Sequence, residues 1–284
     1  MKNIAIITGA SSGMGKEFAV QVAKKHDFDE IWIIARRKDK LEEIANTINS
    51  TNHFNVIRPI QLDLCGKDGI NQLKDILEKE NEQLIKVESS IKIGLLVNNA
   101  GYGTYGPFEE TPLEKELQMV DLNCTSLTGI CGIALPYLKK GSVIINTSSI
   151  AAFLPLGNFA VYAATKSYVL SFSVALKAEL KDKGIKVCAL CPGSVSTEFA
   201  DVASNGARKE VKGGIPPQKV VAHCLKRAFA GKSIAIYRIK WNITAFFSRF
   251  VCRYHGARYT YKYQKRPYKQ DEKKETSVSI DEFL

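Results

Sequence analysis

Apolar residues along this chain follow two alternating patterns. Short runs of four to seven largely apolar residues alternate with longer stretches in which apolar residues recur at helical spacing. The short runs predict strands, and the longer stretches predict helices. The predicted strands cover residues 3–7, 31–35, 55–60, 93–97, 143–146, 185–191 and 234–237. The predicted helices cover residues 16–25, 39–50, 67–88, 112–138, a stretch after Gly157 to about 180, and 217–230.

This alternation predicts the fold class and the place of the site. Strands that alternate with helices of this length form βαβ units in a parallel sheet. Right-handed crossovers bring the carboxyl ends of such strands to one edge, where ligands bind in a crevice. We therefore expect an α/β fold with its functional residues just after the strands.

The turn after the first strand has the composition of a phosphate-binding loop. Thr8-Gly9-Ala-Ser-Ser-Gly13-Met-Gly15 joins that strand directly to the first helix. Glycine permits a tight turn and the close approach of backbone to a ligand. The start of the helix presents amide N–H groups and the positive end of its dipole to a phosphate. In this setting a dinucleotide-binding turn is favoured over a merely flexible one.

The second strand ends in two arginines, Arg36 and Arg37, with the nearest acid only at Asp39. At this position of dinucleotide-binding folds an acid binds the free ribose hydroxyls, whereas an arginine accommodates a 2′-phosphate. The pair therefore favours NADP, with NAD as the alternative. Two solvated arginines in a basic protein are the competing interpretation. Asp63, after the third strand, lies where adenine could meet it.

Tyr162 and Lys166 are four residues apart on a predicted helix, so they share one face. A lysine ammonium near a tyrosine favours the phenolate, and such a pair can move a proton to or from a carbonyl or alcohol oxygen. Ser149, after the preceding strand, can hydrogen-bond the same oxygen. Taken alone, the spacing is as consistent with a surface pair. Asn123, within a helix that must pack on the sheet, is either a satisfied core asparagine or a holder of water beside Lys166.

Together these residues resemble the short-chain dehydrogenase/reductase family. The resemblance covers residues 1–237 and rests on the glycine turn, Asp63, Asn98-Asn99-Ala100-Gly101, Asn123, Ser149, Tyr162-x-x-x-Lys166 and Pro192-Gly193, in the family's order. It implies a single Rossmann-type domain, a doubly wound parallel sheet of seven strands, and hydride transfer between a nicotinamide and a carbonyl or alcohol. Ser12 stands where some NADP-using members carry a basic residue, so the preference for NADP depends on Arg36 and Arg37.

The resemblance also implies roles for individual residues. Tyr162 would be the general acid/base, Ser149 would orient the oxygen, Lys166 would depress the tyrosine pKa and bind the nicotinamide ribose, and Asn123 would support the proton relay. The expected cofactor-binding residues are Gly9, Ser11, Ser12, Gly13, Met14, Gly15, Arg36, Arg37, Asp63, Leu64, Asn99, Ala100, Gly101, Tyr162, Lys166, Pro192, Gly193, Val195 and Thr197. Apolar residues near the expected pocket favour a hydrophobic carbonyl or secondary alcohol as the substrate: Phe153, Leu154, Phe199, Val202, Tyr102 and Tyr105.

Composition narrows the alternatives further. The chain has 284 residues, 45% hydrophobic and 24% charged, which is typical of a globular protein. No apolar run reaches the ~18 residues of a spanning helix, and no signal peptide is evident. The seven cysteines are scattered, and strand alternation should point Cys188 and Cys191 to opposite faces as buried thiols. No His/Cys cluster has zinc spacing. We therefore expect a cytoplasmic protein without a metal.

The residues beyond 237 differ from the rest. Residues 238–269 carry nine Lys/Arg, nine aromatic residues and no acid, and so supply +9 of the net charge of +11. Residues 270–284 have a composition typical of disorder. Helical spacing predicts one apolar stripe, Ile243, Phe246, Phe247, Phe250 and Tyr254. We expect this stripe to cap the crevice or pack on a second subunit of a homodimer or homotetramer, with an anionic membrane surface as the alternative and no nucleic acid.

Two classes of function are consistent with the sequence. The first is an NADP-dependent reductase or dehydrogenase, with an NAD-preferring alcohol dehydrogenase as a variant of it. The second is a non-catalytic, cofactor-binding regulatory protein on the same fold. A regulatory protein has no need of Ser149, Tyr162, Lys166 and Asn123 together, so the full set favours the enzyme.

Overall fold

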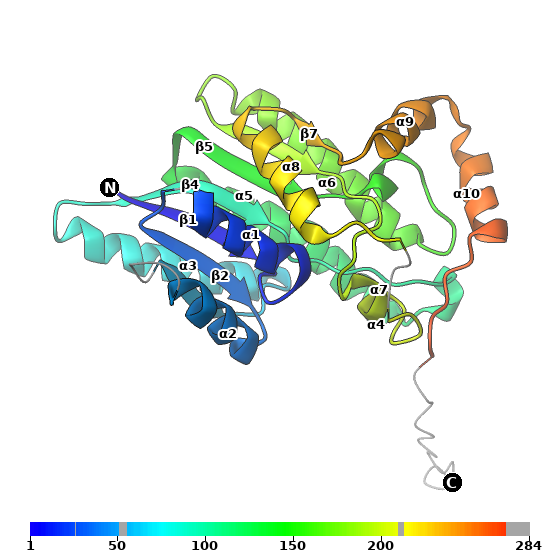
Figure 1. The fold of residues 1–284 in the computed structure, drawn as a ribbon, viewed down its shortest axis with the longest axis horizontal. Coiled ribbons are helices and arrows are strands. Elements are labelled where there is room, and N and C mark those ends of the chain that lie inside the picture. The colour runs from blue at the N-terminus through cyan, green and yellow to red at the C-terminus, as the bar shows by residue number, and fades with distance from the viewer. Residues whose placement is uncertain (26, 51–55, 210–212, 271–284) are drawn as a thin grey trace, which may run out of the picture.

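A computed structural model describes residues 1–25, 27–50, 56–209 and 213–270 of the chain. Its seven strands form one parallel sheet in the order β3-β2-β1-β4-β5-β6-β7 (Figure 1). The strands are β1 Lys2–Thr8, β2 Glu30–Ala35, β3 Ile57–Gln61, β4 Ile91–Asn98, β5 Leu138–Thr147, β6 Lys186–Leu190 and β7 Ile234–Ala235. The predicted α/β class is confirmed. Two expectations concern residues outside the described ranges. They are the tail 270–284, of which only Gln270 is described, and the start of the third strand at Asn55.

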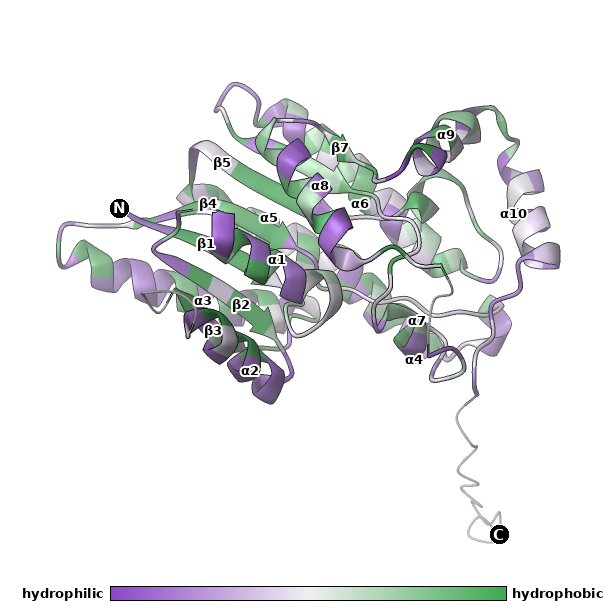
Figure 2. Cartoon of the chain, in the orientation of Figure 1, coloured by the Kyte–Doolittle hydropathy of each residue, from purple (hydrophilic) through white to green (hydrophobic). Residues whose placement is uncertain are grey.

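Two layers of helices cover the sheet. On one face, α1 (Gly13–Lys25), α2 (Lys38–Asn49) and α8 (Pro217–Phe229) bury their apolar sides against alternate strand residues. On the other face, α3 (Gly66–Ile85), α5 (Leu127–Ala134) and α6 (Ala160–Glu179) do the same. Hydrophobic residues accordingly fill the strands between the layers (Figure 2). A strand buried on both faces is continuously apolar, which is why these strands were recognisable as short runs.

The strand order changes direction between β1 and β4, and hydrogen bonds join the ends of these two strands. The Thr8 hydroxyl oxygen accepts bonds from the backbone N–H groups of Asn99 and Ala100, both at 3.0 Å. The Asn99 amide donates in return to the carbonyl oxygens of Thr8 and Gly9, each at 3.3 Å. The glycine turn and the segment after β4 therefore form one rigid unit at the point where α/β sheets bind their ligands.

The helix expected over 112–138 is divided into α4 (Leu113–Val120), a π-helical segment η2 (Asp121–Ser126), α5 and a short η3 (Leu135–Tyr137). A π-helical turn inside an α-helix commonly lies at a functional site, and Asn123 is on this one. By length and hydropathy the stretch Leu113–Tyr137 could cross a membrane. Part of this stretch is buried in the protein, including Met119, Asn123 and Ile130.

The C-terminal extension leaves the sheet after β7 and forms α9 (Ile239–Phe247), η5 (Ser248–Phe250) and α10 (Arg253–Tyr263). In Figure 1 these helices lie beyond the end of the sheet that carries α7 (Phe199–Ala203), a helix within the expected loop 194–215. The single apolar stripe predicted here is wrong, because the helix is interrupted at Val251, which is extended, and at Cys252, which is not helical. The stripe residues also point outward: Phe250 is 73% exposed and Tyr254 is 71% exposed.

Candidate active site

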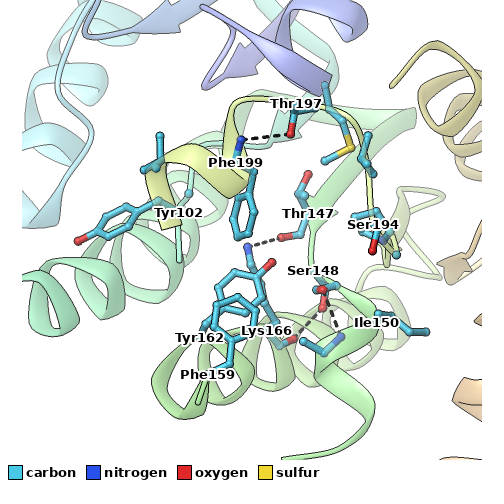
Figure 3. Close-up of a pocket in the computed structure, with 18 of the residues that line it drawn as sticks. Tyr102, Thr147, Ser148, Ile150, Phe159, Tyr162, Lys166, Ser194, Thr197 and Phe199 are labelled. Atoms are coloured by element: carbon cyan, nitrogen blue, oxygen red, sulfur yellow. Dashed lines mark hydrogen bonds between the residues drawn. The ribbon is translucent and has the colours of Figure 1, made fainter. Parts of the chain in front are cut away.

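A cavity of about 1100 Å³ lies at the carboxyl ends of the strands. The glycine turn, the ends of β2, β4 and β5, and the segment after β6 form one part of its wall. Residues of α7, α9, α10 and the segment after α10 form the other. All but one of the expected cofactor-binding residues line this cavity, as do Ser149 and all six apolar residues expected around the substrate. Figure 3 shows Tyr162 and Lys166 facing this space together with Thr147 and Phe199.

The glycine turn is shaped for close approach. Gly9 and Gly13 have φ values of +65° and +53°, in the left-handed region that favours glycine. A Cβ on Gly9 would lie 2.8 Å from the Cα of Ala100, so only glycine fits between the two strand ends. The exception among the cofactor residues is Gly15, which does not line the cavity. A Cβ there would collide with the carbonyl of Gly9, so Gly15 permits the helix to pack on the turn.

Arg36 and Arg37 lie at the cavity edge, as expected, but each faces an acid. Arg37 donates to the Glu198 carboxylate at 3.0 Å and to the Ser11 hydroxyl at 3.1 Å. Arg36 lies 3.9 Å from the Asp63 carboxylate, in a pair that is largely exposed. Exposed pairs of this kind contribute about 0–1 kcal/mol, so a phosphate can displace them. Glu198 was not predicted, because it follows β6 by eight residues and no local pattern links it to β2.

Tyr162 is buried at the centre of the cavity wall. Its ring stacks on Phe159 at 4.1 Å between centroids and meets Phe199 at 5.4 Å. Burial raises the pKa of Tyr162 above its ordinary value, and a hydrogen bond with Ser149 partly offsets this rise. The expectation that Lys166 depresses the pKa of this tyrosine is therefore wrong for the protein alone, because loss of water outweighs the other influences. The neutral phenol is a proton donor at physiological pH.

Lys166 lies one helical turn from Tyr162, and its Nζ is 5.5 Å from the centre of the tyrosine ring. The ammonium donates to the carbonyl oxygen of Thr147 at 2.9 Å (Figure 3). Burial lowers the pKa of Lys166 to about 8. Ser148, next to the expected Ser149, binds elsewhere, since its hydroxyl donates to the Lys166 carbonyl at 2.7 Å. The hydroxyl oxygen of Ser149 accepts from the N–H of Ala151 at 3.1 Å, which holds it at the cavity wall.

Asn123 does not line the cavity. Its side chain accepts from the N–H of Tyr102 at 3.2 Å and donates to the Tyr102 carbonyl at 2.9 Å. It also donates to the Thr165 hydroxyl at 3.1 Å. A Cβ on Gly101 would lie 2.6 Å from Asn123 Oδ1 and 3.5 Å from Lys166 Nζ. Asn123 thus connects the segment after β4 to α6. It is both a hydrogen-bonded core residue and a neighbour of Lys166, so the two interpretations of this residue do not exclude each other.

Residues of the extension complete the cavity, and most were not anticipated as site residues. Trp241 of α9 packs against the backbone of Gly193, and a side chain at that glycine would collide with the indole. The indole N–H of Trp241 is buried without a hydrogen-bond partner in the described part of the chain. His255, Tyr259 and Arg266 line the opposite wall. The only sequence signal for them was the density of aromatic and basic residues after 237.

The residues present fit a nicotinamide dinucleotide. The left-handed glycines, the start of α1 and Arg36 with Arg37 suit phosphates. Gly101 lies beside Lys166, and the unpartnered indole of Trp241 lies against Gly193 in the lining of the same cavity. Among the described residues, no group of three His, Cys, Asp or Glu side chains could hold a metal ion. Cys188 and Cys191 are buried in separate clusters, as strand alternation predicted.

Comparisons with known proteins show the family and the fold of this chain. The model of the short chain dehydrogenase family matches residues 3–207. A very-long-chain 3-oxoacyl-CoA reductase of Rattus norvegicus is 36% identical over 205 residues, which are 70% of this chain and 61% of the relative. A serine 3-dehydrogenase of Agrobacterium fabrum is 32% identical over 72% of this chain and 77% of its own length. The structure of a short-chain dehydrogenase from Sphingobium yanoikuyae in complex with NADPH covers 87% of this chain and 94% of its own, at 25% identity and a TM-score of 0.73. The chain spans about three-fifths of the length of the curated reductase it matches.

Proposed function

Because the chain belongs to the short-chain dehydrogenase family, we propose that it is an NADP-dependent oxidoreductase of a hydrophobic carbonyl or secondary alcohol. The observation that carries the proposal is the placement of Ser149, Tyr162 and Lys166 on one wall of a cavity whose other end is the glycine turn. When bound, the nicotinamide supplies the hydride to the carbonyl carbon or accepts it from the alcohol carbon.

The proton chemistry belongs to Tyr162. In the direction of reduction, its hydroxyl donates a proton to the carbonyl oxygen as that oxygen gains negative charge. The raised pKa of Tyr162 keeps this proton in place at neutral pH. Ser149, whose hydroxyl lies close enough to Tyr162 to lower its pKa, donates to the same oxygen and orients it. The stacked ring of Phe159 limits the rotation of the tyrosine and excludes water from it.

Lys166 and Asn123 support this step. The Lys166 ammonium is fixed by the Thr147 carbonyl and can bind a ribose hydroxyl with its remaining donors. Its positive charge also favours the tyrosinate that forms when the proton leaves. Asn123 acts as a positioning residue, since it holds the backbone of Tyr102 and, through Thr165, the helix that carries both Tyr162 and Lys166.

The choice of NADP over NAD is supported by Arg36 and Arg37 at the tip of β2, where no acid follows the strand directly. A 2′-phosphate gives these arginines a doubly charged partner in place of the exposed carboxylates of Asp63 and Glu198. The alternative is a preference for NAD. A comparison of NADPH with NADH distinguishes the two.

The substrate is proposed to be apolar near its reacting carbon, because Phe159, Phe199, Val202 and Leu154 border the cavity beside Tyr162. Two relatives are named for chemistry at position 3, one as a 3-oxoacyl-CoA reductase and the other as a serine 3-dehydrogenase, and these names support a reacting carbon at position 3 of the substrate. A 3-oxo or 3-hydroxy acyl compound is therefore our first choice within the wider class of hydrophobic carbonyls.

We propose further that the protein is a cytoplasmic homodimer or homotetramer. Leu113, Leu117 and Val120 on α4 and Tyr168 and Val174 on α6 are exposed apolar side chains on two neighbouring helices. The two helices contact each other, so a second copy packed there would cover them together.

The test is NADPH oxidation, and NADP reduction in reverse, by purified protein over a panel of 3-oxo and 3-hydroxy acids, their esters, and steroid and aromatic ketones. Turnover of at least one class, with NADPH preferred to NADH, supports the proposal. A protein that binds NADPH without turnover of any compound is instead a cofactor-binding regulatory protein.

A further inference from the structure

Arg266 brings a positive charge into the substrate part of the cavity. Its guanidinium carbon lies 4.3 Å from the centre of the Phe159 ring and 5.2 Å from that of Tyr105. Phe159 in turn stacks on Tyr162. One aromatic ring therefore separates the guanidinium from the ring that carries the catalytic hydroxyl. Stacking of this kind holds the planar guanidinium in a defined orientation.

This cation has no acidic partner in the part of the chain that the structure describes. The ion pairs seen there do not include Arg266, and the influences that favour its charged form come from Tyr105 and Tyr162. Burial lowers the pKa of Arg266, and the positive charge of Arg208, which lines the same cavity, acts in the same direction. A partly dehydrated guanidinium without an acidic partner is costly unless an anion joins it.

The backbone around Arg266 is anchored on both sides. Before it, the Thr260 hydroxyl accepts from the N–H of Gly157 at 2.8 Å, and the Asn158 amide donates to the Thr260 carbonyl at 3.2 Å. After it, the N–H of Lys269 donates to the Ser204 carbonyl at 3.0 Å. The strap from Thr260 to Lys269 is therefore held at both ends, and Arg266 within it is part of the cavity wall.

We infer that the substrate carries a carboxylate close to its reacting carbon, and that Arg266 binds this carboxylate. The fork of N–H donors on a guanidinium matches the two oxygens of a carboxylate. Phe159 and Phe199 would pack on the apolar chain of the same molecule. This inference rests on the proposed function for the identity of the reacting carbon, but it predicts binding independently of turnover.

The experiment compares 3-hydroxyoctanoate with its methyl ester, which keeps the shape and loses the charge. Binding is measured by calorimetry in the presence of saturating NADP, for the wild type, Arg266→Gln and the control Arg258→Gln. Arg258 also lies against an aromatic ring on α10 but does not line the cavity. We expect the acid to bind roughly ten- to a hundredfold more tightly than the ester to the wild type and to the control, and the difference to vanish in Arg266→Gln.

Equal binding of acid and ester to the wild type, or an acid preference that survives in Arg266→Gln, overturns the inference. The outcomes for the proposed function are separate. If the protein turns over neutral ketones and shows no preference for the acid, the proposed oxidoreductase function is supported and the proposed role of Arg266 is refuted. If the protein binds the acid selectively but turns over none of the compounds, the proposed role of Arg266 is supported and the proposed oxidoreductase function is refuted.

A second inference comes from the outer side of the same extension. Phe246, Phe247 and Phe250 form an exposed aromatic cluster, with ring centroids 5.4 to 6.4 Å apart. Ile243 and Tyr254 of the same extension are also more than half exposed. We call Phe246, Phe247 and Phe250 the aromatic patch. The exposed side chains of Arg249 and Arg253 lie in the same segment.

We propose that the aromatic patch binds an anionic lipid surface. Residues 238–269 carry nine basic residues and no acid, which complements anionic headgroups around inserted aromatic rings. A second copy of this chain suits the patch less well. A symmetric contact would bring the same basic segment of both copies together, and like charges across an interface oppose binding.

The test is sedimentation with vesicles of phosphatidylcholine alone or mixed with phosphatidylglycerol. We expect salt-sensitive binding to the anionic vesicles only, lost in the triple variant Phe246→Ser/Phe247→Ser/Phe250→Ser. The control Ile85→Ser/Val87→Ser removes two exposed apolar side chains elsewhere and should bind like the wild type. Absence of vesicle binding, or equal binding to both vesicle types, overturns the proposal. So does a concentration-dependent dimer in ultracentrifugation that the triple variant abolishes, because the patch would then be an interface between copies.

Discussion

The two walls of the cavity are built in different ways. The cofactor wall consists of short segments directly after strands, and its shape depends on backbone: left-handed glycines, a helix start and the bonds of Thr8 to Asn99 and Ala100. The substrate wall beyond Tyr162 combines Phe199 and Val202 of α7 with side chains from the C-terminal extension, and the extension lies outside the segment matched by the family model. The cofactor wall therefore lies within the segment matched by the family model, whereas much of the substrate wall lies outside it, and we expect substrate specificity to depend on the substrate wall.

The largest expected effect tests the reaction centre where the two walls meet. Tyr162→Phe removes the proton donor and leaves the ring stacked on Phe159, so kcat should fall roughly 10²–10⁴-fold while NADPH still binds. Kinetics and cofactor titration by fluorescence measure the two quantities. Near-normal turnover in this variant would refute the mechanism.

The cofactor wall alone is tested by Arg36→Ala/Arg37→Ala. Each charge-assisted bond to a phosphate contributes roughly 1.5–3 kcal/mol, so the preference for NADPH over NADH should shrink at least tenfold. Glu198→Gln sharpens the test. It frees Arg37 from its carboxylate and should tighten NADPH binding a few-fold without affecting NADH. A wild type that prefers NADH would show that the end of β2 was misinterpreted.

The substrate wall alone is tested by deletion of residues 252–284. This variant keeps α9, with Trp241 and Ala245 on the core, and loses α10 and the strap. KM for the substrate should rise roughly tenfold, because the apolar and cationic far wall is gone, whereas the affinity for NADPH should stay within about twofold. Thermal melting verifies folding. Equal losses of cofactor and substrate binding would contradict the division into two walls.

The smallest effect concerns pH and Lys166. Its pKa in the folded protein is about 8, against 10.5 for an ordinary lysine, so between these pH values the unfolded chain binds more protons than the folded one. The free energy of unfolding should therefore rise with pH across this window, by at most about 1.4 kcal/mol per unit from this group. Denaturant titrations of the wild type and Lys166→Met should differ in slope there and not below pH 7. Parallel slopes would mean that the ammonium is not dehydrated as the structure indicates.

Much of the fold and of the cofactor wall could be predicted because the signals are local. A strand buried on both faces is apolar without interruption, and the residues that follow it reach the same edge of the sheet whatever else the chain does. Gly15 and Asn123 were expected among the site residues, but neither lines the cavity, since sequence spacing does not show which side of a helix or turn faces a ligand.

The amino-acid sequence by itself determined the parallel sheet, the phosphate-binding turn, and the Ser149, Tyr162 and Lys166 set, because each is encoded by residues close together or by the period of the pattern. Only the tertiary structure decided how the extension is used. The helix break at Val251, the anchoring of Thr260 on Gly157 and of Lys269 on Ser204, and the outward aromatic patch depend on contacts between segments up to about a hundred residues apart. The raised pKa of Tyr162 was decided there too, since the loss of water around its ring comes from Phe159, Phe199 and the strap packed together.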